Sequence, residues 1–323
     1  MTRSRVIALS LASSLLLLLV LAAPWLLAWR PAAREAAPTA CIGRAPALLA
    51  GQALKVMSWN VGHLAGQTPS NEQVEPEHLE RNLQAVIEAI REQEPDIVLL
   101  QAVDVGDTRT DRMDQLAALQ AGLSDRYPCS SSAFYRQARW LPLPTLFDSA
   151  GARLGILSRY RLADGERLQL PLAEPSGWRA AFADKQALLW VRLPIRRGGE
   201  ITLGTLLLDE HSAAQAQRQG EQVQRWADGW LAEGRTLLLG GDFSHWQRPQ
   251  ALADRRLAEI PDPYAPMRED PSPIPSPDGG APPRTRIIHS GNIKRLDAMQ
   301  PPLRTAVSPS APLIARLLLP VGS

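Results

Sequence analysis

The chain has 323 residues, of which 45% are hydrophobic and 21% are charged, and this balance excludes a largely disordered protein and predicts a sizeable buried core. The formal net charge is +2, but Arg3, Arg5 and Arg30 flank a hydrophobic segment, and without them 32 basic residues face 33 acidic ones. Because the rest of the chain carries no basic excess, its composition disfavours a function in nucleic-acid binding.

The N-terminal segment from Val6 to Trp29 contains no charged residue. A helix of this length can cross a hydrocarbon core of about 30 Å. The run is longer than the apolar part of an ordinary cleavable signal, so we expect residues 1–30 to be an uncleaved signal anchor or transmembrane helix, with cleavage left open. Arg3 and Arg5 should stay in the cytoplasm by the positive-inside rule. The predicted localisation is therefore the membrane, as a single-pass protein whose domain lies on the non-cytoplasmic side.

Residues 31–53 are rich in Ala and Pro, and this composition predicts a linker between the anchor and a domain. Only two cysteines are present, Cys41 in this segment and Cys129 further along the chain. In an oxidising compartment the two can form a disulfide, but two free buried thiols are equally compatible with the sequence.

Helix and strand patterns alternate from residue 54 onward, and we treat residues 54–323 as one domain. Apolar residues recur at helical spacing after Pro76, and Pro95 should end that helix. Two more helices are expected, over about residues 111–123 and around residues 223–231. Buried strands are expected over residues 54–61, 96–101, 154–158, 187–193, 201–208, 236–239 and 313–319.

Residues 261–283 contain nine prolines and predict an irregular loop. Some of the expected strands are consecutive, and no glycine-rich phosphate loop follows a strand. The sequence therefore predicts an α/β fold of the two-sheet sandwich type rather than a Rossmann-type sheet.

Five short motifs occur in the order and spacing of a known family. They are SWNV at residues 58–61, DIVLLQ at 96–101, GILSRYRL at 155–162, LGGDF at 239–243 and SPSAPLIARLLL at 308–319. With these motifs the chain resembles the endonuclease/exonuclease/phosphatase superfamily over nearly all of residues 54–320. The resemblance implies an α/β/β/α sandwich whose strand ends bind a divalent cation, usually Mg²⁺. It also implies phosphoester hydrolysis, in which the metal neutralises phosphate charge while an activated water attacks.

Four family positions are retained or partly retained in this sequence. The resemblance makes Asn60 and Asp242 candidate catalytic residues, and Asp242 also a candidate metal ligand. Gln101 precedes the position of the family's metal-binding Glu, and Ser244 stands where the family's GDxN signature has Asn, so both are candidate binding residues. Asn60 and Asp242 also have a structural interpretation, because Asn and Asp at strand ends cap local backbone donors.

Other positions needed for the family's chemistry hold residues that cannot perform it. Ala102 stands where the family has its metal-binding Glu, and Leu206 aligns with a family His. The closing Ser-Asp-His-x-Pro motif reads Ser308-Pro309-Ser310-Ala311-Pro312. Pro309 and Ser310 therefore replace an Asp and a His, and proline offers neither a side-chain acceptor nor a backbone donor.

The sequence offers one substitute for the missing metal ligand. Residues two apart in a strand share a face, so Asp104 can point where Ala102 points if the strand continues that far. Asp104 and Asp242 would then offer two carboxylates to a weakly held, mostly hydrated Mg²⁺. In the alternative, Asp104 and Asp107 are acids of a surface loop.

The substitutions favour a catalytically impaired family member, a pseudoenzyme or binding module tethered to the membrane by its N-terminal helix. Its partner would be a protein or a phosphorylated ligand that the sequence does not identify. The alternative is a Mg²⁺-dependent phosphodiesterase or phosphatase with an atypical site, and Mg²⁺ is the one cofactor that the sequence suggests. Nucleic-acid binding without catalysis is disfavoured by the charge balance.

Overall fold

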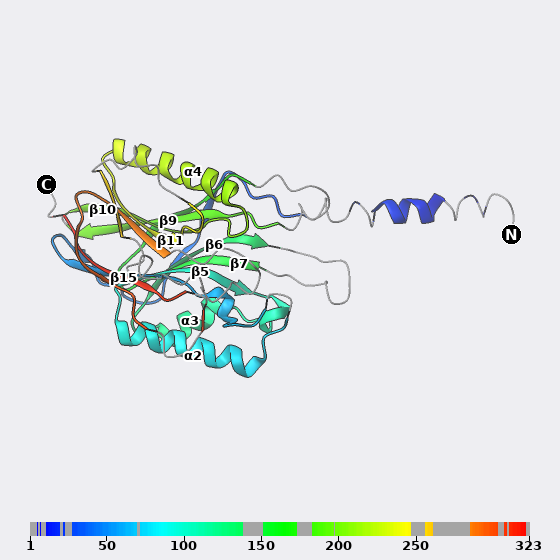
Figure 1. Ribbon diagram of the computed structural model, residues 1–323, viewed down its shortest axis with the longest axis horizontal. Coiled ribbons are helices and arrows are strands. Elements are labelled where there is room, and N and C mark those ends of the chain that lie inside the picture. The colour runs from blue at the N-terminus through cyan, green and yellow to red at the C-terminus, as the bar shows by residue number, and fades with distance from the viewer. Residues whose placement is uncertain are drawn as a thin grey trace, which may run out of the picture.

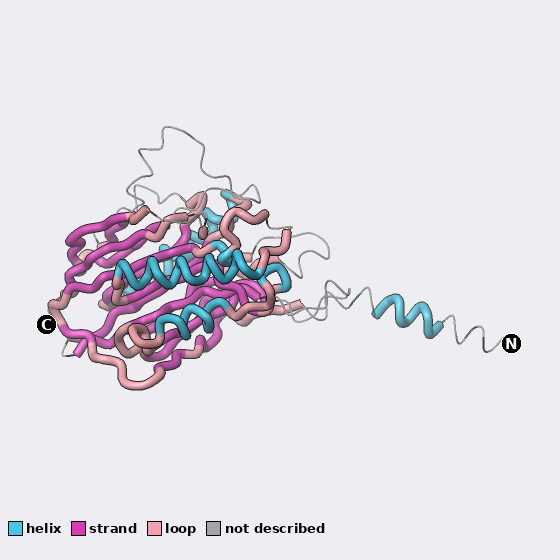
Figure 2. Tube along the Cα trace, turned by 90° about the horizontal axis from the view of Figure 1, so that it is seen from below, coloured by secondary structure: helices cyan, strands magenta, loops and turns pink. Residues whose placement is uncertain are grey.

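Two β-sheets lie face to face, and helices cover their outer faces (Figures 1 and 2). The structure is a computed structural model. It describes residues 11–19, 28–69, 72–137, 151–172, 183–196, 198–246, 256–260, 285–302, 307–308 and 310–320, and the single positions 5, 7 and 22. Two mixed sheets with helices outside are the arrangement that the sequence predicts.

The first sheet, sheet A, has the strand order β1, β8, β9, β10, β11, β13, β12, and β3 pairs with β9 beside this path. The neighbours β10 and β11 run parallel, as do β3 and β9, and the other pairs are antiparallel. Its strands are β1 (Arg34–Ala37), β3 (Leu48–Leu49), β8 (Ala163–Gln169), β9 (Ala187–Arg196), β10 (Gly199–Leu207), β11 (Thr236–Asp242), β12 (Leu257–Ile260) and β13 (Thr285–Ser290).

The second sheet, sheet B, has the order β14, β15, β4, β5, β7, β6, β2. Its central neighbours β4 and β5 run parallel, and the other pairs are antiparallel. Its strands are β2 (Thr39–Cys41), β4 (Ala53–Asn60), β5 (Ile97–Val105), β6 (Cys129–Gln137), β7 (Gly151–Ser158), β14 (Lys294–Met299) and β15 (Leu313–Leu318).

Three hydrophobic cores hold these layers together. One lies between the sheets, one between sheet B and the helices α2 (Pro76–Gln93) and α3 (Gln115–Leu123), and one between sheet A and α4 (Ala213–Ala232). Alternate residues of β5 enter the first two cores: Leu99 packs between the sheets and Leu100 packs under the helices. A strand buried on both faces shows a continuous apolar run, and this explains the strong strand signal in the sequence.

The helix ends follow local chain chemistry. Pro76 is the first residue of α2, and the helix stops at Gln93 because Glu94, in the left-handed conformation at φ 47°, precedes Pro95. The helix expected over residues 111–123 begins later, at Gln115, because the side chain of Asp114 caps its N-terminus.

The helix expected around residues 223–231 is longer than predicted. It starts at Ala213, where the Ser212 side chain accepts a hydrogen bond from the Gln215 backbone N–H. Its buried residues recur along one face from Gln215 to Trp230. Polar Gln residues on that face weaken its hydrophobic periodicity, so the sequence pattern revealed only the C-terminal half.

The central strand β5 continues past the predicted residues 96–101, as far as Val105. Its pairing with β7 shifts between Leu100 and Val103, and Ala102 lies within this bulge at φ 55°. A bulge inserts an extra residue and re-aims the side chains that follow it.

The linker expected over residues 31–53 is wrong where the chain pairs with the sheets. Residues of this segment form β1 on sheet A, β2 on sheet B and β3 against β9. Cys41 of β2 lies opposite Cys129 of β6, and a disulfide joins the two. The segment is therefore part of the folded body.

The predicted membrane segment is only partly described. Residues 11–19 are helical and exposed, and most other residues between 6 and 27 lie outside the described part of the chain. No helix among the described residues is both long and apolar enough to cross a membrane. The proline-rich stretch 261–283 also lies outside the described residues.

Candidate functional site

The parallel pairs β4/β5 and β10/β11 end at the same edge of the sandwich, which we call the strand-end edge. In sheet B, Asn60 at the end of β4 pairs with Gln101 of β5. In sheet A, Leu207 at the end of β10 pairs with Asp242 at the end of β11. Three of the four positions retained by the sequence are therefore brought to one edge, and Ser244 follows two residues later.

Asn60 and Asp242 bond to one another across the two sheets. The Asn60 side-chain nitrogen donates to Asp242 Oδ2 at 3.0 Å. Asn60 Oδ1 accepts from the Gly62 backbone N–H at 3.0 Å, which fixes the turn after β4. Asn60 is 2% exposed and Asp242 is 0% exposed, so the contact is enclosed.

The second oxygen of Asp242 is held by Ser244. Asp242 Oδ1 accepts from the Ser244 backbone N–H at 3.0 Å and from its hydroxyl at 2.6 Å. Ser244 is itself fully buried. The Ser at the family's Asn position thus closes a local turn around Asp242, and both carboxylate oxygens of Asp242 have protein partners.

Gln101 forms a second bridge between the sheets. Its side-chain nitrogen donates to Thr205 Oγ1 of β10 at 2.8 Å and to the Leu99 carbonyl oxygen at 3.1 Å. The side chain is fully buried, and its Oε1 has no hydrogen-bond partner among the described residues. This acceptor is the one atom of the four candidate residues that is left unsatisfied.

The final motif packs behind Asn60. The hydroxyls of Ser308 and Ser310 both donate to the Asn60 carbonyl oxygen, Ser310 at 3.1 Å. The indole of Trp59 donates to the Ser310 carbonyl oxygen at 2.9 Å. Ser310 therefore supports the backbone of β4, and Pro309 lies outside the described residues.

The position aligned with a family His does not face this edge. Leu206 lies in the core under α4, together with residues of β9 and β11. Its neighbour Leu207 pairs with Asp242 and packs between the sheets. Because paired residues of neighbouring strands share a face, Leu207, and not Leu206, lies on the same face of sheet A as Asp242.

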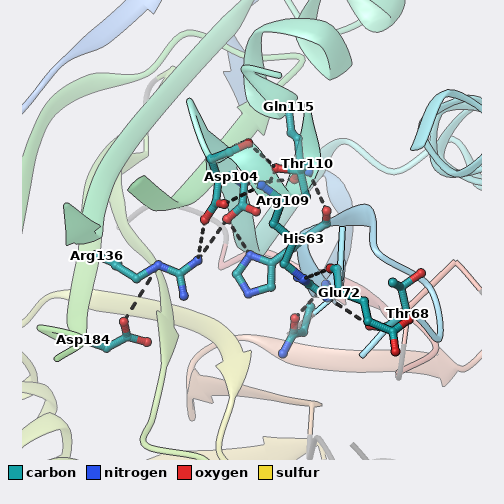
Figure 3. Close-up of polar contacts among 12 residues, drawn as sticks. His63, Thr68, Glu72, Asp104, Arg109, Thr110, Gln115, Arg136 and Asp184 are labelled. Atoms are coloured by element: carbon teal, nitrogen blue, oxygen red, sulfur yellow. Dashed lines mark hydrogen bonds and ion pairs between the residues drawn. The ribbon is translucent and has the colours of Figure 1, made fainter. Parts of the chain in front are cut away.

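Asp104 lies at the centre of a second polar group, shown in Figure 3. The Asp104 carboxylate bonds to His63 Nδ1 at 2.6 Å, Thr110 Oγ1 at 3.1 Å and Arg136 at 3.3 Å. The Gln115 side chain accepts from the Asp104 backbone N–H at 2.9 Å. Asp104 is 1% exposed, whereas the His63 side chain is 22% exposed. Asp104 is therefore not an acid of a solvated loop.

Electrostatics keep Asp104 ionised despite its burial. Burial alone raises the pKa of this carboxyl group, but the charge and hydrogen bond of His63, with Arg136 and Thr110, outweigh it and hold the pKa below its ordinary value. A carboxylate only accepts hydrogen bonds, so His63 Nδ1 is the donor of the pair.

Arg136 connects this group to the other sheet. Asp104 and Arg136 pair with Ala152 of β7 from opposite sides, so both side chains project over the small Ala152. The guanidinium also lies 3.7 Å from Asp107 and 4.0 Å from Asp184, which precedes β9. Burial lowers the pKa of Arg136, but the surrounding acids, Asp184 foremost, raise it above its ordinary value.

Neither His63 nor Arg136 was predicted from the sequence. His63 and Asp104 each follow a paired strand residue, Asn60 and Gln101, by three positions. That equal offset was the available signal, since residues just beyond paired ends of parallel strands come together. Arg136 carried no such signal, because it approaches through the antiparallel strand β6.

The donor set does not fit the metal that the family resemblance implies. Ala102 offers no side-chain oxygen, and both oxygens of Asp242 are engaged by Asn60 and Ser244. Asp104 is engaged by His63, Thr110 and Arg136, whose positive charge would repel a cation. Within the described ranges no three Asp, Glu, His or Cys side chains are grouped as a metal ion requires.

Comparisons with known proteins bear on the fold. The model of the Endonuclease/Exonuclease/phosphatase family matches residues 57–288. A solved endonuclease/exonuclease/phosphatase from Beutenbergia cavernae DSM 12333 is 20% identical, covers 83% of this chain and 72% of its own, and has a TM-score of 0.59.

Two further solved structures are similar. The human Nocturnin catalytic domain with bound sulfate anion is 16% identical over 87% of this chain and 96% of its own, with a TM-score of 0.53. TDP2 from Caenorhabditis elegans is 17% identical over 84% of this chain and 75% of its own, with a TM-score of 0.52. At these identities the likeness shows the fold alone. No curated protein matches the chain.

Proposed function

We propose that this chain, which belongs to the endonuclease/exonuclease/phosphatase family, is a catalytically impaired member that acts as a binding module held at a membrane. The observation that carries the proposal is the state of Asp242. Its carboxylate is fully buried, and its two oxygens accept from Asn60 and from Ser244. A carboxylate that serves the fold in this way is withdrawn from metal and substrate.

The substitutions remove several of the groups that phosphoester hydrolysis needs. Metal-assisted hydrolysis needs hard oxygen ligands for the cation, a base for the water and a charged group over the phosphate. Ala102 supplies no ligand, and Ser310 is bonded to the backbone of Asn60. Groups that act as one catalytic unit are not additive, so losing one removes most of the rate advantage.

The second candidate function is a phosphodiesterase or phosphatase with an atypical site. The unpartnered Oε1 of Gln101 favours it, because a buried acceptor at the strand-end edge is a possible ligand of a hydrated Mg²⁺. Asp104 would have to leave Arg136 and His63 to complete that site. The cost of breaking a buried charge pair makes this the weaker candidate.

The location outside the cytoplasm is part of the proposal. Val6 to Trp29 is long enough to span a bilayer, and its first charges lie on the N-terminal side. The bond between Cys41 and Cys129 supports an oxidising compartment. The partner would be a protein or a phosphorylated ligand of the membrane surface, and the chain's charge balance disfavours nucleic acid.

A thermal-shift experiment separates the two candidate functions. A metal present at a hundred times its Kd stabilises the folded state by about 2.7 kcal/mol. We expect Mg²⁺ or Mn²⁺ to leave the melting temperature of the full chain in detergent unchanged. The matched control is Asp297→Ala, which removes an exposed acid of β14. A rise in melting temperature on adding metal, lost in Asp242→Asn and kept in Asp297→Ala, would support the atypical enzyme instead.

A further inference from the structure

The end of the hydrophobic segment is seated on the folded body. The Trp29 ring packs edge-on against Phe134 of β6, with centroids 6.5 Å apart. The Arg167 guanidinium of β8 lies 5.0 Å from the centroid of the same ring. Trp29 is thus held between one strand of each sheet before β1 begins.

The chain that follows Trp29 is fastened to both sheets in turn. The Ala33 carbonyl oxygen accepts from the Gln169 backbone N–H at 3.0 Å, and β1 continues this pairing along β8 of sheet A. The chain then crosses to sheet B, where β2 pairs with β6 and Cys41 is bonded to Cys129. No linker therefore separates Trp29 from the domain. The position of Trp29 thus determines where the domain lies relative to the structure that holds the preceding hydrophobic segment.

Trp29 is seated at the strand-end edge. Gln137 at the end of β6 and Val105 at the end of β5 both pair with Gly151, the first residue of β7. Phe134 therefore lies three residues before the end of β6 at this edge, two positions from Arg136. In sheet A, Gln169 at the end of β8 pairs with Ala187 at the start of β9, so the end of β8 lies at the same edge.

We infer that the strand-end edge faces the membrane and that its contact partner is the lipid surface. The inference rests on the proposed function, because it requires Val6 to Trp29 to span the bilayer. A spanning helix leaves the hydrocarbon at the headgroup level, where Trp side chains are favoured. With Trp29 at that level and no slack after it, the edge with His63 and Arg136 lies next to the headgroups. The turns at the other end of the sheets point away from the bilayer.

Two variants that each add one cysteine to the native pair test this orientation in the full chain. Thr108→Cys is exposed next to Asp107, which lies 3.7 Å from Arg136. Glu200→Cys is exposed at the start of β10, the opposite end of the sheet. The native cysteines are bonded to each other, so each new thiol alone takes a nitroxide label. The labelled chains are reconstituted in phosphatidylcholine vesicles that contain a nickel-chelating headgroup lipid.

We expect the nickel headgroups to relax the label at residue 108 several-fold more than the label at residue 200. The control combines Trp29→Ala with a flexible Gly-Ser insertion after Arg30, which frees the domain from the preceding segment. In this variant the relaxation of the labels at residues 108 and 200 should become similar. Flotation of the vesicles reports anchoring separately. A chain that does not float overturns both the anchoring and the orientation. A chain that floats with equal relaxation at the two sites, or with more at residue 200, overturns the orientation alone.

Discussion

Asn60 and Asp242 are separated by 182 positions in the chain, yet the Asn60 amide donates directly to the Asp242 carboxylate and joins the two sheets at their parallel strand ends. Gln101 and Thr205 make a second side-chain contact between the sheets, and Arg136 with Asp184 makes a third. Residues that the family resemblance assigns to chemistry are here contacts between sheets.

Removing Asp242 should destabilise the protein. Asp242→Ala would leave the Asn60 amide and the Ser244 N–H and hydroxyl buried without their acceptor, and we expect a loss of about 2–4 kcal/mol in the free energy of unfolding. Urea unfolding monitored by circular dichroism measures it. A residue kept for catalysis is often neutral or stabilising when removed, so an unchanged or raised stability would contradict the structural role.

Asp104 should make the protein sensitive to acid. Its pKa is lowered in the folded state, so its contribution to stability is complete above the unfolded pKa of about 3.9 and is lost as pH falls through the folded value. The unfolded state takes up the proton first, and stability therefore falls in acid. We expect Asp104→Asn to be less stable than the parent near neutral pH and to approach it below about pH 4. If the two proteins instead differed in free energy of unfolding by the same amount from neutral pH to below pH 4, the ion pairs of Asp104 would contribute nothing to stability.

The bond between Cys41 and Cys129 should stabilise the domain strongly, because it closes a loop with a sequence separation of 88. For a loop of this size the chain-entropy account gives about 4.6 kcal/mol. The paired variant Cys41→Ser, Cys129→Ser should lose most of this, and non-reducing peptide mapping of the parent should recover the linked peptides. Two alkylatable thiols in freshly isolated protein would exclude the bond.

The predicted topology can be tested with reporters. The last strand, β15, ends at Leu318, which pairs with Ala53 at the start of β4, so a fusion after this strand lies at the end of sheet B opposite the strand-end edge. A reporter that works only in the cytosol should be silent at this position, and one that works only outside should be active. Strong cytosolic signal would refute a domain on the non-cytoplasmic side.

The sequence predicted the layers of this fold well because its central strands are buried on both faces and read as uninterrupted apolar runs. The short strands β1 and β2 were missed, since edge strands of three or four residues depend on pairing with β8 and β6 rather than on a pattern of their own. The Pro and Ala content of that segment resembles a linker, yet tertiary pairing overrides it.

The candidate site was predicted in part. Asn60, Gln101, Asp242 and Ser244 lie together, as expected for residues at the ends of parallel strands. Asp104 lies in the strand, which the sequence allowed, but the bulge at Ala102 prevents simple alternation from giving its direction. Its partner Arg136 comes from β6, and a contact between distant strands leaves no trace in local spacing.

Hydrolysis of a generic phosphodiester tests the central claim most directly. Purified full chain and its Asp242→Asn variant, both confirmed as folded by circular dichroism, are assayed on bis(4-nitrophenyl) phosphate with Mg²⁺ or Mn²⁺. The account predicts equal rates at the background level in both proteins, because Asp242 is already bound to Asn60 and Ser244. Metal-dependent turnover in the parent that disappears in Asp242→Asn would contradict it.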